Sequence, residues 1–107
     1  MSGISTHVLD TELGRPAAGV TVRLEFRTIG EWVLMATTTT DDGGRVPELL
    51  GGPLDIGEYR IGFDIAGYRD GAFFPEVLIT FRVTAVDEHH HVPLLLSPFG
   101  YTTYRGS

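Results

Sequence analysis

The stretch VTVRLEFRT, residues 20–28, places an apolar residue at every second position and a polar or charged residue between each pair. Successive side chains of a β-strand point to opposite faces, so this period of two predicts a strand with one buried face. The same alternation occurs in EYRIGFDI, residues 58–65, and in EVLITFRVTAV, residues 76–86. WVLMATTTT, residues 32–40, is rich in β-branched and aromatic residues and also predicts a strand.

Turn-forming residues separate these segments. Glycine, proline, aspartate and serine gather at residues 14–16, 41–44, 51–53 and 97–98. Many short strands separated by turns at this spacing are typical of a β-sandwich. We therefore expect an all-β protein, an antiparallel β-sandwich of seven to eight strands, with at most one short helix near residues 65–74.

Composition narrows the class of protein. The length fits one domain, so we expect a single domain over residues 1–107, and 42% hydrophobic residues suffice for a packed core. A net charge of −6 disfavours nucleic-acid binding, because too few basic residues are present to neutralise phosphates. The absence of cysteine excludes disulfides and thiol chemistry.

No segment has the length of a membrane span or the pattern of a signal peptide. The longest uninterrupted apolar run covers only residues 92–96, and the first ten residues hold no basic segment followed by an apolar one. We therefore expect a soluble, cytoplasmic protein that does not bind membranes.

Three of the four histidines stand together at residues 89–91, directly before the apolar run VPLLL, residues 92–96. If alternate residues of that run, beginning with the valine, enter the core, then His90 lies on the core face. His89 and His91 then face away from the core.

The N-terminal stretch ISTHVLD, residues 4–10, has the same alternation. If Val8 is a core residue, His7 lies on the outer face of its sheet. The same outer face would carry the apolar residues Leu9, Pro93 and Leu95. An apolar stripe on an outer face is typical of a contact with a partner, most commonly a second copy of the chain.

Simpler interpretations apply to each of these residues taken alone. A histidine near the N-terminus is more often an ordinary surface residue, and Arg45 is a charged residue in a turn. His89 and His91 would have Cα atoms ~7 Å apart and could both face one ion. Without cysteine or an evident third ligand, we expect no metal site.

Three stretches resemble segments of the 5-hydroxyisourate hydrolases, the transthyretin-related proteins of urate breakdown. They are STHVLDTELGRPAAGVTVRL at residues 5–24, GGRV at residues 43–46 and HHHVPLLLSPFGYTTYRGS at residues 89–107. The likeness covers nearly the whole chain. Its most specific part is the tetrapeptide YRGS, residues 104–107, on which that family ends.

The resemblance implies a transthyretin-like (prealbumin-like) β-sandwich assembled as a homotetramer, a dimer of dimers, with active sites in the channel between dimers. It also implies a hydrolase of purine catabolism. The reaction opens the six-membered ring of 5-hydroxyisourate to give 2-oxo-4-hydroxy-4-carboxy-5-ureidoimidazoline, and it uses no cofactor.

The family's functional positions can be carried over residue by residue. The catalytic positions fall on His7, Arg45, His91 and Ser107. The substrate-binding positions fall on Tyr104, Arg105 and Gly106, with His89 as a further candidate. Two departures stand out. The turn reads Asp42-Gly43-Gly44-Arg45 where the family usually has Asp-Gly-Arg, and His90 stands where the family commonly has tyrosine, so we interpret His90 as structural.

Two other functions are compatible with this fold. One is a small-molecule carrier of the transthyretin type, which binds an aromatic ligand in the channel between dimers. Transthyretin lacks the YRGS ending and the histidine pair, which favours the enzyme. The other is a purely structural sandwich module, and that interpretation leaves the histidines and the tail unexplained.

Overall fold

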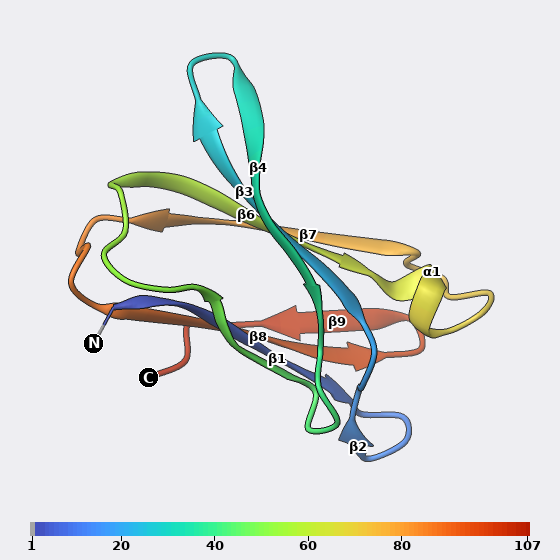
Figure 1. Cartoon of the computed structure of the whole chain (residues 1–107). Coiled ribbons are helices and arrows are strands. Elements are labelled where there is room, and N and C mark those ends of the chain that lie inside the picture. Colours follow the sequence, from blue (N-terminus) through green and yellow to red (C-terminus); the bar gives the residue numbers. More distant parts are fainter. Residues whose placement is uncertain (1) are drawn as a thin grey trace.

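Residues 2–107 are described by the computed structural model, in which two β-sheets pack face to face (Figure 1). The first sheet contains β1 (Gly3–Asp10), β2 (Arg15–Pro16), β5 (Arg45–Leu50), β8 (His89–Ser97) and β9 (Gly100–Thr103). The second sheet contains β3 (Thr21–Thr28), β4 (Glu31–Thr39), β6 (Gly57–Asp64) and β7 (Glu76–Val83). The helix α1 (Ile65–Tyr68) follows β6 directly.

Strand order places β1 near the middle of the first sheet. That sheet runs β2-β1-β8-β9, and β5 pairs with β1 on the same side as β2. The second sheet runs β4-β3-β6-β7. No helix within residues 2–107 has the length and apolarity needed to cross a membrane.

The prediction of a transthyretin-like, all-β sandwich with at most one short helix is confirmed, and α1 lies in the segment that was expected to hold it. Two details of the prediction were wrong. The described residues form nine strands rather than seven to eight, because the two-residue β2 adds a short edge segment. β1 and β8 also run parallel, not antiparallel. Parallel neighbouring strands need a long connection. Residues 11–88 supply it, and they include all four strands of the second sheet.

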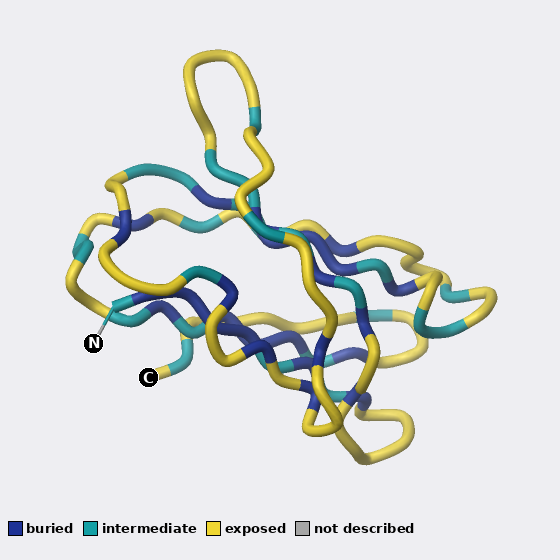
Figure 2. The backbone as a smooth tube through the Cα atoms, viewed as in Figure 1, coloured by how far each residue is buried: buried dark blue, intermediate teal, exposed yellow. Residues whose placement is uncertain are grey.

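The core lies between the sheets and follows the alternation of the sequence (Figure 2). Val22 and Leu24 of β3 are fully buried, as are Ile61 and Phe63 of β6. These residues face the other sheet, whose fully buried residues include Leu94. Burial of each such side chain contributes about 1.5–3 kcal/mol to folding, so the two inner faces hold the sheets together.

The turn before β5 explains the additional glycine. Gly44 has φ +73°, a left-handed conformation that glycine adopts without strain, and a Cβ there would overlap the Val8 carbonyl oxygen. The Gly44 carbonyl accepts a hydrogen bond from the Val8 amide at 2.7 Å. The Asp41 carboxylate accepts one from the Arg45 amide at 2.9 Å. This turn therefore fixes the register that pairs Arg45 with His7.

A buried carboxylate anchors the opposite end of β1. Asp10 accepts hydrogen bonds from the Glu12 and Leu13 amides, both at 3.1 Å, from the Tyr68 hydroxyl at 2.8 Å and from the Arg69 guanidinium. Burial raises the pKa of the Asp10 carboxyl, but the bonds from Tyr68, the Leu13 amide and Arg69 lower the pKa by more. Asp10 is therefore held ionised, and it ties β1 to the end of α1.

Candidate functional site

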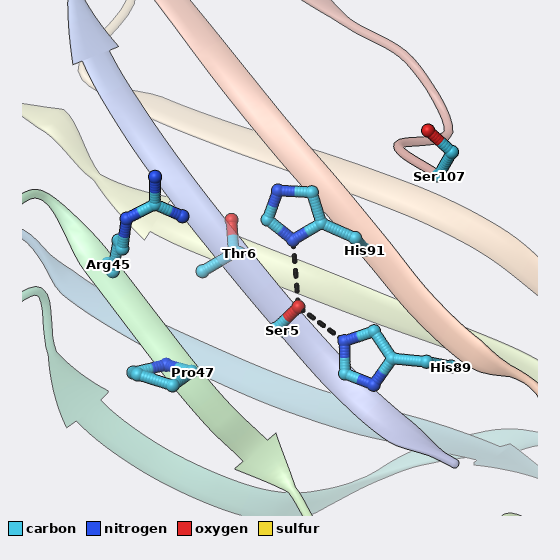
Figure 3. Close-up of a pocket in the computed structure, with 7 residues that line it drawn as sticks. All are labelled: Ser5, Thr6, Arg45, Pro47, His89, His91 and Ser107. Carbon is cyan, nitrogen blue, oxygen red and sulfur yellow. Dashed lines mark hydrogen bonds between the residues drawn. The ribbon is translucent and has the colours of Figure 1, made fainter. Parts of the chain in front are cut away.

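Three strands of the first sheet bring the polar residues of its outer face together. β1 lies between β5 and β8, so it has a neighbour on each side. Because β1 and β8 are parallel, Ser5 pairs with His91, while on the other side His7 pairs with Arg45. Residues distant in sequence thus meet on one surface (Figure 3).

A cavity of about 460 Å³ lies on this face, a size typical of small-molecule sites. Its lining residues are Ser5, Thr6, Arg45, Pro47, His89, His91 and Ser107. It combines one guanidinium, two imidazoles and several hydroxyls. Such groups can hold a polar molecule and move a proton.

Ser5 connects the two histidines of the cavity. Its Oγ lies 2.7 Å from His89 Nε2 and 2.7 Å from His91 Nδ1 (Figure 3). Only 6% of Ser5 is exposed, so its hydroxyl has little access to water and depends on these partners. The other ring nitrogen of His91, Nε2, points away from Ser5 and has no hydrogen-bond partner among residues 2–107.

The surroundings of the His91 imidazole favour its neutral form. Burial lowers its pKa below the ordinary histidine value, and the nearby His7, His89 and Arg45 side chains lower the pKa further, because a positive charge on any of them opposes a second one on His91. A neutral imidazole with a free Nε2 can accept a proton, which is the property required of a general base.

The tail is bound to the same strand. The Gly106 amide donates to the His91 carbonyl at 2.8 Å, and the two residues form an isolated antiparallel bridge. A Cβ at Gly106 would lie 2.5 Å from His91 Cδ2, so only glycine lets the tail pass this ring. Backbone conformation does not require this glycine, because its φ is not positive. The bridge brings Ser107 to the cavity wall.

Comparison with known proteins places the chain in a family. The sequence model of the HIUase/Transthyretin family matches residues 4–106. The chain belongs to this family. It is 44% identical to the 5-hydroxyisourate hydrolase of Caulobacter vibrioides, over all of both chains. It is 47% identical to the uric acid degradation bifunctional protein of Arabidopsis thaliana, in which 97% of this chain matches 37% of that protein.

Solved structures of the family share the fold. The 5-hydroxyisourate hydrolase of Klebsiella pneumoniae aligns with a TM-score of 0.87 and 35% identity, covering 100% of each chain. Sea bream transthyretin in complex with thyroxine also aligns with a TM-score of 0.87, at 30% identity over 96% of this chain and 93% of that one. The family therefore includes both hydrolases and a hormone-binding protein on one scaffold.

Four of the eight positions carried over from the family line the cavity directly: Arg45, His89, His91 and Ser107. Gly106 packs on the His91 ring, and with Arg105 it lines an adjoining hollow of about 550 Å³ that shares His89 and Ser107. The Arg105 guanidinium pairs with Glu88 at 3.0 Å.

His7 and Tyr104 do not line this cavity. His7 lies on the same face, where its Nε2 donates to the Gly43 carbonyl at 2.9 Å. Tyr104 lines a separate groove between β7 and the tail, together with the buried His90. Arg45, expected in a turn, is the first residue of β5.

Sequence reasoning missed three lining residues. Ser5, Thr6 and Pro47 have no distinctive motif of their own. Ser5 could have been found, because it lies two residues before His7 and thus on the same strand face. The expected outer stripe is also narrower than the alternation indicated, since Leu9 and Leu95 are half-buried and Pro93 is buried. Within residues 2–107 no group of three potential metal ligands is found, and the absence of a metal stays a prediction.

Proposed function

We propose that this protein is a 5-hydroxyisourate hydrolase of urate catabolism. One observation carries the chemistry: the His91 imidazole, whose pKa burial lowers, shares a cavity with the Arg45 guanidinium. The substrate follows from the 44% identity to a hydrolase of that name over both whole chains. The reaction adds water to 5-hydroxyisourate and opens its six-membered ring, giving 2-oxo-4-hydroxy-4-carboxy-5-ureidoimidazoline.

Ring opening requires water to attack a carbonyl carbon beside a ring nitrogen. His91 Nε2 takes a proton from the water as its oxygen bonds to that carbon. Arg45 donates hydrogen bonds to the carbonyl oxygen and stabilises the negative charge that develops on it. The carbon–nitrogen bond then breaks, its electron pair goes to the ring nitrogen, and the proton held by His91 returns to that nitrogen.

Residues at the edge of the cavity hold the substrate. We assign the base to His91 and not to His7, because His7 Nε2 is occupied by the Gly43 carbonyl and the ring does not line the cavity. His7 orients the water or the substrate from the rim. Ser107 closes the site at the tail and contributes hydrogen bonds, whereas Tyr104 faces a separate groove and Arg105 borders the adjoining hollow.

Replacement of the proposed base tests the mechanism. A positioned acid–base group supplies ~10²–10⁴-fold in rate, so His91→Ala should lower kcat by that factor without unfolding the sandwich. The assay follows the ultraviolet absorbance of 5-hydroxyisourate, formed in situ from urate, against its spontaneous decay. His90→Tyr is the matched control, because this neighbouring histidine faces the core and the family commonly has tyrosine there. Wild-type turnover in His91→Ala would exclude it as the base.

Assembly into a homotetramer, a dimer of dimers, forms part of this proposal. In it the cavity faces the channel between dimers, which is consistent with its position on the outer face of the first sheet. Light scattering after gel filtration should give four times the 11.7 kDa of one chain. A monomer with full activity would contradict the assembly. The cytoplasmic location stays a prediction.

The likeness to sea bream transthyretin with bound thyroxine favours a second candidate, a carrier of aromatic ligands. The cavity argues against it, because two imidazoles and a guanidinium in the lining would lose their hydration against an apolar ligand. Unaccelerated decay of 5-hydroxyisourate, together with tight binding of an aromatic ligand, would identify the carrier.

A further inference from the structure

A chain of three hydrogen bonds joins residues that line the cavity to the backbone of Ser2. The Ser2 carbonyl oxygen lies 3.1 Å from His89 Nδ1. His89 Nε2 lies 2.7 Å from Ser5 Oγ, and Ser5 Oγ lies 2.7 Å from His91 Nδ1. The chain begins at a backbone carbonyl and ends at the ring that we propose as the base.

The number of protons available sets the direction of every bond in this chain. A carbonyl oxygen can only accept, so His89 Nδ1 carries a proton and donates it. While both rings are neutral, the His89 ring has only one N–H, so His89 Nε2 accepts, and its donor is the Ser5 hydroxyl. That hydroxyl has a single hydrogen and has used it, so Ser5 Oγ accepts from His91 Nδ1. His91 Nε2 is then left without a proton.

We propose that Ser5 and His89 are positioning residues that fix His91 in the Nδ1–H tautomer and aim its Nε2 lone pair away from the sheet. The consequence for the rate rests on the proposed hydrolase function, but the tautomer does not. If every hydrogen bond between the two neutral rings ran in the opposite direction, His89 Nδ1 would carry a lone pair instead of a proton. That lone pair would face the Ser2 carbonyl oxygen at 3.1 Å, and two acceptors at this distance repel each other.

Three further observations support a fixed ring. Ser5 is buried, so water competes little for its hydroxyl. Gly106 packs against the opposite edge of the His91 ring, which limits its rotation. Burial lowers the pKa of His91, which favours the neutral form for which the choice of tautomer matters.

The arrangement performs the task that a buried carboxylate performs in serine proteases. There the carboxylate accepts from the imidazole Nδ1–H, and a wrong tautomer lowers kcat by ~10⁴-fold. Here a hydroxyl, itself oriented by a second imidazole, is the acceptor. Removing the hydroxyl does not impose the wrong tautomer but frees the ring, so we expect a smaller loss of about 10- to 100-fold, as for other residues that orient an imidazole.

The tautomer can be observed directly in the wild-type protein. With ¹⁵N-labelled histidine in alkaline buffer, where free imidazoles are neutral, long-range ¹H–¹⁵N spectra distinguish a protonated from an unprotonated ring nitrogen. We expect His91 to carry its proton on Nδ1. A His91 ring protonated on Nε2 would overturn the proposal, and this measurement needs no variant to fold and no activity.

Variants test the consequence for catalysis. Ser5→Ala should lower kcat about 10- to 100-fold with little change in KM, since the hydroxyl acts through His91. Ser5→Thr, which keeps a hydroxyl, should restore most of the rate. Ser97→Ala is the matched control, because that serine is on the same strand as His91 but bonds only to Gly100, in the β8–β9 hairpin. Wild-type kcat in Ser5→Ala would refute the positioning role.

A double-mutant cycle separates His89 from a direct contact with substrate. If His89 acts only by orienting Ser5, then Ser5→Ala/His89→Ala should lose no more rate than Ser5→Ala alone. Additive losses would overturn the role proposed for His89. If the wild-type protein did not accelerate the decay of 5-hydroxyisourate, the hydrolase proposal would fail, and the His91 tautomer would still be decided by the spectra.

Discussion

Replacing Gly106 by alanine should reduce turnover while leaving the fold intact. In the structure, a Cβ at this position would lie 2.5 Å from His91 Cδ2 and 3.1 Å from Cγ. Carbon atoms in contact are normally 3.5–4.0 Å apart, so the ring or the tail must move by about 1 Å. If the ring moves, Nε2 of His91, the proposed base, is misplaced. If the tail moves, it takes Ser107 away from the cavity wall.

A displacement of about 1 Å at a reacting group costs on the order of 10²-fold in rate. We therefore expect Gly106→Ala to lower kcat about 100-fold, measured from the ultraviolet absorbance of fresh 5-hydroxyisourate at saturating concentration. The variant also weakens one hydrogen bond, from the Gly106 amide to the His91 carbonyl, which contributes about 1 kcal/mol to stability. The melting temperature should therefore fall by only a few degrees.

Gly100→Ala is the control for this experiment. Gly100 belongs to the β8–β9 hairpin, its φ is not positive, and the nearest atom to an added Cβ is Ser97 Oγ at 3.4 Å, an ordinary contact. Its kcat should equal that of the wild type. If Gly106→Ala also kept wild-type kcat, the packing of the tail on the His91 ring would have no part in catalysis, and the reasoning would be refuted.

Three further predictions concern pH and stability. Because the pKa of His91 is lowered, folding favours its neutral form. The acid limb of the kcat/KM profile should therefore bend below pH ~6.5, the pKa of a free imidazole. A bend above that pH would contradict the assignment of His91 as the base. Asp10→Asn leaves the partly buried Arg69 unpaired and should lower the free energy of unfolding, measured by urea titration, by about 3 kcal/mol. This difference from the wild type should shrink at acid pH, where Asp10 of the wild type becomes protonated. Gly44→Ala forces a residue with a side chain into the left-handed region and should lower the free energy of unfolding by at least about 1 kcal/mol. The melting temperature should then fall by about 4 °C or more. Gly43→Ala, whose φ is not positive, should change the melting temperature little.

Periodicity made the sandwich predictable. In residues 20–28 and 58–65 the apolar residues at every second position pack into the core as expected. A strand with one buried face produces this period of two in its sequence. The same rule put His7 and His91 on an outer face; His91 lines the cavity there, and His7 pairs with Arg45, which lines it too. The pairing of the strands was not predictable in this way. A period of two is the same in a parallel and an antiparallel neighbour, so the direction of β1 against β8 could not be read from it.

The detailed geometry of the site was also outside the reach of the sequence. The bonds of Ser5 to two imidazoles depend on the register between β1 and β8, which no local pattern encodes. The sequence alone marked Gly106 as a candidate position of the site. It could not show why a glycine is needed there, because the ring that leaves no room for a Cβ, that of His91, lies on another strand. Tyr104, Arg105 and Ser107 belong to the same C-terminal tetrapeptide. The side chains of Tyr104 and Arg105 nevertheless face other grooves, because neighbouring residues of an extended tail point in different directions.

The parallel pairing of β1 with β8 also bears on the order in which parts of the protein fold. Ser5 and His91 are 86 positions apart, so a nascent chain carries β1 without this neighbour until β8 has left the ribosome. Contacts of such high sequence separation form slowly, because the entropy of closing the loop is lost before the contact is gained. The β3–β4 hairpin, which holds Trp32, has no such delay. During refolding, catalytic activity should therefore return later than tryptophan fluorescence.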